Sequence, residues 1–255
     1  MLNIIAKNAA NQMLNLQTND KYQLISATGI NPPVANINTA QLATADGSVF
    51  NVARLPQRNI VLTIQPLYGI EKARNDLYKW FAPKMPVNLE AVTDFKDVLI
   101  DGYVESFECD LYANPQLVQV SVICPDPYFR AKSAVTDKTL PTSICNPGDA
   151  ESGIVFTATM TGNASGLGIQ NYANGVYHNF TMSGLTLQSG DVVTIDTRVG
   201  QKSVKLNRSG SVSSLISKVN LASEWLQMYP GNNSFSVSLS NGTIKAAYTP
   251  LYMGV

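Results

Sequence analysis

Few residues of this chain have the types and spacing that enzymes use. Catalysis by side chains usually needs a nucleophile, a base and a group that orients the base. The single histidine, His178, lies between Tyr177 and Asn179, away from any Gly-x-Ser-x-Gly motif or reactive-cysteine context. A Ser/His/Asp triad could form only if folding brought its members together. We therefore expect His178 to lie on a sheet surface, and we assign no catalytic residue.

The cysteines do not have the pattern of a metal site. Cys109, Cys124 and Cys145 are separated by 15 and 21 residues, without a Cys-x-x-Cys or a nearby Cys/His pair. A zinc site would require all three thiols and His178 to converge. We expect buried or half-buried free thiols in a reduced compartment, with no metal and no cofactor.

Carboxylates gather between residues 94 and 110, where they could form a calcium site or a glycosidase pair. They are Asp94, Asp97, Asp101, Glu105, Glu108 and Asp110. The odd positions of a strand share one face, so Tyr103 and Phe107 accompany Asp101 and Glu105. This mixture predicts a solvated strand surface rather than a cation site.

Two further patterns could bind a ligand. Residues 162–168 (GNASGLG) are rich in glycine but lack the P-loop lysine and do not fit Gly-x-Gly-x-x-Gly, so we expect a flexible hairpin end. The aromatic residues Tyr172, Tyr177, Trp225 and Tyr229 could form a platform that stacks on a sugar. Residues 224–231 (EWLQMYPG) more simply predict a corner at which Trp225 closes the edge of a sandwich.

Composition excludes several classes of protein. The 18 basic residues balance the 18 acidic ones, and only 14% of residues are charged. Because neither half of the chain is basic, the electrostatic signature of a general nucleic-acid binder is missing. No apolar stretch approaches the ~18–20 residues that span a bilayer. Polar residues interrupt positions 1–16, so we expect neither membrane insertion nor Sec-type export.

Short strands separated by turns dominate the pattern and predict a mainly β fold. In the first half, strands are predicted at residues 2–6, 13–16, 22–26, 39–44, 49–53, 59–64, 87–92, 98–108 and 117–124. Asp46-Gly47 predicts a type I′ hairpin between two of them. One helix is predicted over Ile70–Phe81, where apolar residues recur every three or four positions between Gly69 and Pro83.

The second half reads as a β-sandwich. Residues 130–152 have weak periodicity and two prolines, so we place a boundary there between domains of residues 1–135 and 136–255. Beyond it, strands are predicted at residues 153–160, 175–182, 192–196, 203–206, 234–239 and 243–248, with a short helix over 212–219. Many short strands at this spacing are typical of a sandwich.

The order of these short segments resembles that in the distal tail proteins of long-tailed, non-contractile bacteriophages (siphophages). The segments are Tyr22–Ile25, Gly29–Pro33, Asp46-Gly47, Arg58–Leu62, Arg74–Phe81, Ile100–Glu108, Val120–Phe129, Gly190–Asp196, Trp225–Asn233 and Tyr248–Val255. No one of them is diagnostic, and their order carries the resemblance over nearly the whole chain. Residues 161–175, rich in Ser and Asn, depart from the family's pattern.

The resemblance implies a fold and a role. Family members have an N-terminal β domain with one helix, which forms a six-membered ring, and a galectin-like β-sandwich outside the ring. The ring, single or stacked, joins the tail tube protein to the tail-associated tip protein and the receptor-binding proteins, and DNA passes through its channel. The resemblance implies no enzyme, no cofactor and no sequence-specific nucleic acid. It places the protein in the virion, at the tail tip, after synthesis in the cytoplasm of the host bacterium.

Two other functions stay open from the sequence. A carbohydrate-binding module of β-sandwich type would recognise a host-surface glycan, and it needs exposed aromatic residues on a sheet face. A β-rich glycosidase would need two carboxylates that face one cleft at ~5–10 Å separation. The solution mass separates the first of these from a tail ring, since the ring has six copies and the module is a monomer that binds sugar.

Overall fold

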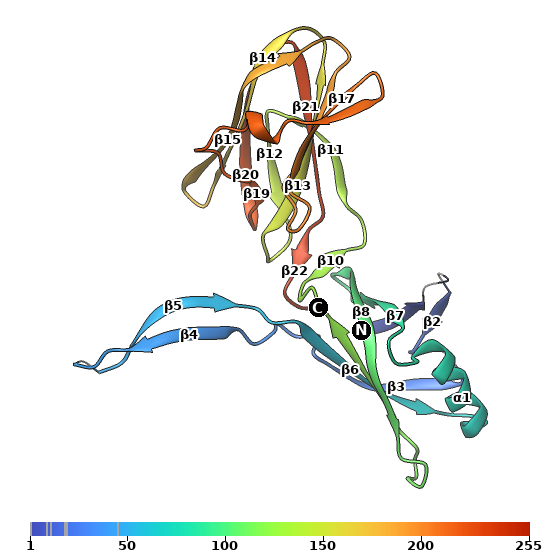
Figure 1. Ribbon diagram of the computed structural model, residues 1–255. Helices are drawn as coiled ribbons and strands as arrows, with labels where there is room; N and C mark the ends of the chain where they lie inside the picture. The colour runs from blue at the N-terminus through green and yellow to red at the C-terminus, as the bar shows by residue number, and fades with distance from the viewer. Residues whose placement is uncertain (1, 9, 11, 18–19, 45) are drawn as a thin grey trace. The chain divides into compact units, whose positions relative to one another are not determined.

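A computed structural model describes residues 2–8, 10, 12–17, 20–44 and 46–255 (Figure 1). The chain groups into two compact units: Met1–Lys132 together with Tyr252–Val255, and Ser133–Leu251. The backbone therefore crosses between the units twice. Over the described residues the fold is mainly β with one α-helix, which confirms the predicted fold class.

The described residues of the first unit form a nine-stranded sheet and a separate two-stranded hairpin. The sheet has the order β2-β1-β7-β8-β9-β6-β3, with β10 pairing both β8 and β22. Its strands are β1 (Asn3–Asn8), β2 (Met13–Asn15), β3 (Tyr22–Thr28), β6 (Arg58–Pro66), β7 (Pro86–Val92), β8 (Asp97–Cys109), β9 (Val118–Cys124), β10 (Phe129–Ala131) and β22 (Leu251–Tyr252). The hairpin consists of β4 (Asn36–Gln41) and β5 (Ser48–Arg54).

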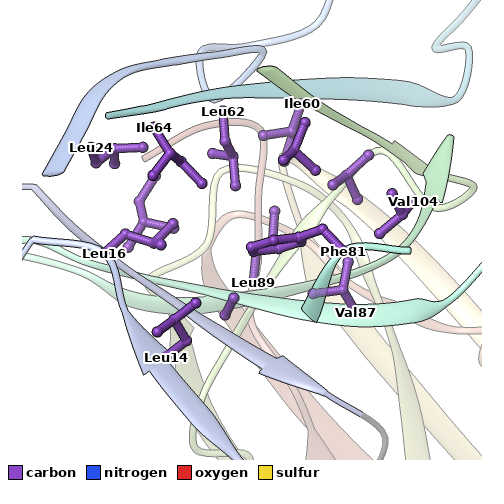
Figure 2. Packing of buried hydrophobic residues seen from close by; sticks show 14 of the residues in the cluster. Leu14, Leu16, Leu24, Ile60, Leu62, Ile64, Phe81, Val87, Leu89 and Val104 are labelled. Atoms are coloured by element: carbon purple, nitrogen blue, oxygen red, sulfur yellow. The ribbon is translucent and has the colours of Figure 1, made fainter. Parts of the chain in front are cut away.

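The core of this unit lies between one face of the sheet and helix α1 (Ile70–Trp80). Strand side chains alternate between faces, so Ile60, Leu62 and Ile64 of β6 all enter the core. Figure 2 shows this row with Phe81, which follows the helix and is fully buried. The helix contributes Leu77, as the predicted spacing requires, and the structure ends it one residue before the predicted Phe81.

The second unit is the predicted β-sandwich. One sheet has the order β11-β21-β13-β16-β17-β18, with β19 on β13, and the other has the order β12-β20-β14-β15. The strands are β11 (Val135–Leu140), β12 (Thr142–Asn146), β13 (Ser152–Met160), β14 (Ala164–Ala173), β15 (Val176–Leu187), β16 (Val192–Asp196), β17 (Ser203–Arg208), β18 (Ser211–Ser214), β19 (Gln227–Met228), β20 (Gly231–Leu239) and β21 (Gly242–Tyr248). Phe156 and Phe235 meet edge to face between the sheets, with ring centroids 6.0 Å apart.

Strands occupy two segments in which sequence analysis predicted none. Residues 130–152, where we placed the domain boundary, contain β11 and β12, which pair with β21 and β20. The expectation of a flexible hairpin end at residues 162–168 is wrong, because residues 164–168 belong to β14, where Leu167 and Ile169 are buried. In both cases neighbouring strands supply the hydrogen bonds, so the tertiary context overrides the low strand propensity of Gly, Ser and Pro.

Two local predictions are also wrong in detail. The predicted helix over 212–219 is instead β18 followed by a 3₁₀ turn at Ile216–Lys218. The predicted two-residue turn at Asp46-Gly47 is longer, because the last β4–β5 pair is Gln41 with Ser48. A register shift between Asn38 and Thr39 sets this pairing, and Ala45 of the connection lies outside the described residues.

Candidate assembly and ligand-binding surfaces

The carboxylates between residues 94 and 110 have separate partners. Asp101 accepts a hydrogen bond from Asn88 (2.7 Å) and pairs with Arg130. Burial raises the pKa of Asp101, but the hydrogen bonds from Arg130 and Asn88 outweigh this and leave the pKa below its usual value. Glu105 accepts a hydrogen bond from Ser121 at 2.8 Å. Within the described ranges no cluster of three or more His, Cys, Asp or Glu residues could hold a metal ion.

The three cysteines are free thiols in different surroundings. Cys124 is buried and Cys109 is half-buried. Cys145 is exposed, so the expectation of buried or half-buried thiols is wrong for this residue. The reason is strand alternation: Ile144 and Asn146 of β12 point into the sandwich, and Cys145 between them points out.

We predict that an alkylating reagent modifies Cys145 at least ~10-fold faster than Cys124 at pH 8, because only a thiolate reacts and burial raises the pKa of Cys124 to about 12. Peptide mass mapping after timed iodoacetamide treatment measures both rates. Because folding favours the protonated thiol of Cys124, its contribution to stability is complete below ~8.5, the pKa of an unfolded cysteine, and declines as the pH rises toward about 12. Equal labelling rates in the folded protein contradict the prediction.

His178 lies on β15 and is half-buried. Its Nδ1 atom lies 2.7 Å from Oε2 of Glu224, and its ring stacks on Tyr229 with centroids 4.8 Å apart. Trp225 packs against the sandwich core beside Phe180, with ring centroids 5.7 Å apart. Trp225 therefore has the position expected of a residue that closes the edge of the sandwich.

Tyr172 and Tyr177, the other two aromatic candidates, lie apart from this cluster. They face each other across β14 and β15, with ring centroids 4.6 Å apart and planes tilted by 41°. Their side chains remain 42% and 61% exposed. Of the four aromatic candidates, these two offer open ring surface to a ligand.

Sequence analysis did not single out the surface of the β4–β5 hairpin. We call this hairpin, together with the two residues before it, the arm (residues 34–54). Every residue of β4 and β5 is exposed, and the hairpin forms its own sheet. Figure 1 shows it, in blue, running out beyond the ends of β3 and β6. Ile37 is 64% exposed and Phe50 is 62% exposed. The arm therefore displays large apolar side chains that its own unit does not cover.

Both faces of the arm carry apolar side chains among polar ones. Residues paired across two strands share a face, so Ile37 lies with Ala53 on one face, and Ala40 lies with Val49 on the other. Residues 34–54 contain only one acidic and one basic side chain. A two-stranded hairpin is marginally stable by itself, and an exposed apolar surface of this kind marks an interaction site.

The buried side chain of Arg58 fixes the base of the arm. It is 3% exposed and lies on β6, directly after the arm. The guanidinium donates hydrogen bonds to the carbonyl oxygens of Gly29 and Asn31 (2.7 Å each), Pro127 (2.8 Å) and Met253 (2.5 Å). Burial lowers the pKa of Arg58 from its usual value. One side chain thus joins the segments on both sides of the arm to the residues that follow β9 and to the C-terminal segment.

The C-terminal residues pack on the same base. The Val255 amide donates to the carbonyl oxygen of Ile30 at 3.2 Å, and Lys96 Nζ donates to that of Gly254 at 2.9 Å. Gly254 approaches the chain so closely that a Cβ there would lie 2.9 Å from Cδ of Pro32. The base of the arm is therefore rigidly held while the arm itself is uncovered.

No helix among the described residues is long and apolar enough to cross a membrane.

Comparisons with known proteins match this architecture. The family of siphovirus-type tail components, C-terminal domain, matches residues 147–252. The crystal structure of the phage SPP1 Dit (gp 19.1) protein, described as a paradigm of the hub adsorption apparatus in phages that infect Gram-positive bacteria, is similar over 98% of this chain and 99% of that chain, with a TM-score of 0.69 and 13% identity. A chain of the phage P2 baseplate in its activated conformation with Ca is similar over 97% of this chain and 98% of its own length, with a TM-score of 0.50 and 10% identity.

No curated protein sequence matches the chain. The family match and the shared fold together confirm the resemblance to siphophage distal tail proteins. Residues 147–252 therefore match the siphovirus-type tail component family, and the whole chain shares its fold with a siphophage hub protein.

Proposed function

We propose that this chain is a structural hub of a siphophage tail. Six copies form a ring through the first unit, the ring connects the tail tube to the adsorption apparatus, and its channel lets DNA pass. The observation that carries the proposal is the fold, which is similar over 98% of the chain to a protein described as a hub. The sandwich of the second unit hangs outside the ring.

The arm supports assembly through the first unit. Its large apolar side chains are exposed on both faces, and its own unit does not cover them. A neighbouring copy that covers the arm does so with a different surface, which makes the contact head-to-tail. Head-to-tail contacts generate a closed ring when the rotation between copies completes a full turn.

The role requires no chemistry from the chain. We propose no catalytic residue, metal or cofactor, and neither an inserted membrane segment nor a sequence-specific nucleic-acid site. The partners in this role are the tail tube protein, the tail-associated tip protein and the receptor-binding proteins. The protein is made in the cytoplasm of the host bacterium and resides at the tail tip of the virion.

The solution mass tests the proposal. We predict that the purified chain has six times the mass of one 27.6 kDa copy, or twelve times for stacked rings, in native mass spectrometry and light scattering. Each contact between copies should bury at least ~1,000 Å², the area that a stable interface needs. A protein that stays monomeric at micromolar concentration, even when it is co-expressed with its tail neighbours, contradicts the ring. A free carbohydrate-binding module predicts that monomer.

A further inference from the structure

The four-stranded sheet is built from strands without charged residues. The strands β12, β20, β14 and β15 contain no Asp, Glu, Lys or Arg. The other sheet of the same sandwich does contain exposed charged residues, among them Lys205 and Lys245. Both sheets have exposed outward side chains, so the lack of charged residues distinguishes the four-stranded sheet from the other sheet of the same unit.

Strand pairing arranges the outward side chains of this sheet in rows, and three adjacent rows form its centre. The first row is Tyr177, Tyr172, Ser234 and Ser143, the second is Asn179, Gln170 and Ser236, and the third is Thr181, Gly168 and Ser238. We call these residues the polar face. They alternate along β14 with Leu167 and Ile169, which are buried in the core. The polar face therefore points away from the sandwich.

The first row provides an aromatic surface. The rings of Tyr172 and Tyr177 lie against each other and are both substantially exposed. Covering an exposed aromatic ring with an apolar surface removes water from the ring, which is favourable. The hydroxyl group of a tyrosine stays at the edge of the ring and can form a hydrogen bond. The C–H face of a pyranose ring is such a surface, bordered by hydroxyl groups.

The second row provides hydrogen bonds next to that surface. Gln170 Nε2 donates to Asn179 Oδ1 at 2.8 Å, and Ser236 Oγ donates to Gln170 Oε1 at 3.3 Å. Each amide has two N–H donors and an oxygen with two lone pairs, so the row retains donors and acceptors beyond these two bonds. It lies two residues, or about 7 Å, along the strands from the tyrosines. The hydroxyl groups of a sugar stacked on the tyrosines reach it.

The third row marks the limit of the proposed contacts. Gly168 carries no side chain, and an added Cβ would lie 3.4 Å from Cβ of Ser238 and 3.7 Å from Cγ2 of Thr181, which are ordinary contact distances. Thr181 Oγ1 accepts a hydrogen bond from Asn220 Nδ2 at 2.9 Å. Since this row lies four residues along β14 from Tyr172, a single sugar stacked on the tyrosines does not reach it.

We propose that the polar face binds a neutral glycan, with one pyranose ring on Tyr172 and Tyr177 and its hydroxyl groups on Gln170, Asn179 and Ser236. A charged ligand would find no counter-charge on these strands. A protein partner would need a larger apolar centre than two tyrosines, because the buried core of a protein interface is mostly apolar. This site requires only the second unit, so it does not depend on the proposed ring.

Saturation-transfer difference NMR on the full-length protein tests the site. The probes are the methyl glycosides of glucose, galactose, rhamnose and N-acetylglucosamine at millimolar concentration, with methyl glucuronide as the charged probe. We expect saturation transfer to at least one neutral glycoside and none to the glucuronide. Tyr177→Ala and Gln170→Ala each weaken the binding by ~10-fold or more, since each removes one of the two kinds of contact.

Two further variants keep the result interpretable. Gly168→Ala, in the third row and outside the proposed contacts, should bind as the unchanged protein does. Lys245→Ala, on the opposite sheet, should also bind as the unchanged protein does, and thermal unfolding confirms that all variants are folded. The proposal is overturned if no neutral glycoside binds, if the glucuronide binds equally well, or if the Tyr177 and Gln170 variants bind like Lys245→Ala. A monomeric protein that still binds sugar contradicts the ring and leaves this site intact.

Discussion

Replacing Ile37 and Phe50 of the arm together by serine is expected to convert the assembled protein into monomers without unfolding it. Both side chains lie on one face of the arm and are more than 60% exposed, so the single chain loses little packing. In a ring, each would be buried against a neighbouring copy, where an Ile or Phe side chain contributes about 1.5–3 kcal/mol. Losing both weakens each contact by ~100-fold or more. Native mass spectrometry and circular dichroism measure the two outcomes.

The matched control replaces Val199 and Leu221 by serine. Both are apolar residues of the second unit that are more exposed than those of the arm. This variant should keep the oligomeric state of the unchanged protein. If the arm variant remains assembled, or if the control dissociates as well, the arm is not the contact between copies.

The elements that the sequence predicted correctly are those whose pattern is local. In β6 the alternation of Ile60, Leu62 and Ile64 reflects one buried face, and the helix shows its buried stripe at three- and four-residue spacing. Asn174-Gly175 is a two-residue turn with both residues at positive φ, which brings Tyr172 opposite Tyr177. A local signal could thus have placed these two rings side by side.

The features that the sequence did not reveal depend on partners far away along the chain. β14 contains two glycines and a serine within its first five residues, and it is a strand because β15 and β20 pair with its two edges. The polar face brings Ser236 beside Gln170 across more than sixty positions, which no pattern within one strand predicts.

The arm illustrates a different limit of sequence analysis. Its strands carry apolar residues on both faces and almost no charge, and this composition is also typical of a strand buried on both sides. Sequence analysis therefore predicted a hairpin there but not an uncovered surface. The nearly uncharged stretch of residues 34–54, between two segments rich in turn residues, was the signal that could have indicated an assembly element.

Replacing Arg58 by alanine is expected to lower the free energy of unfolding of the first unit by about 3–5 kcal/mol. The change removes the donor shared by the carbonyl oxygens of Gly29, Asn31, Pro127 and Met253, from a side chain that is itself 3% exposed. A buried acceptor left without a partner costs about 1–3 kcal/mol, and the loss is smaller than four such costs because Gly29, Asn31 and Met253 are open to water. Urea unfolding measures the loss, and hydrogen exchange locates it at residues 29–32 and 252–255.

Arg54→Ala is the matched control, because Arg54 lies four positions earlier and is exposed on the arm. Its effect on stability should stay within about 0.5 kcal/mol, as for an ordinary surface substitution. Arg58→Lys should fall between the two, since an ammonium group cannot reproduce the planar fork of donors that reaches four separate carbonyls. Faster exchange at the base of the arm and in the C-terminal segment, with the second unit unchanged, identifies Arg58 as the link between them. If Arg58→Ala is as stable as Arg54→Ala, or if its exchange rises uniformly over both units, Arg58 does not hold the base of the arm.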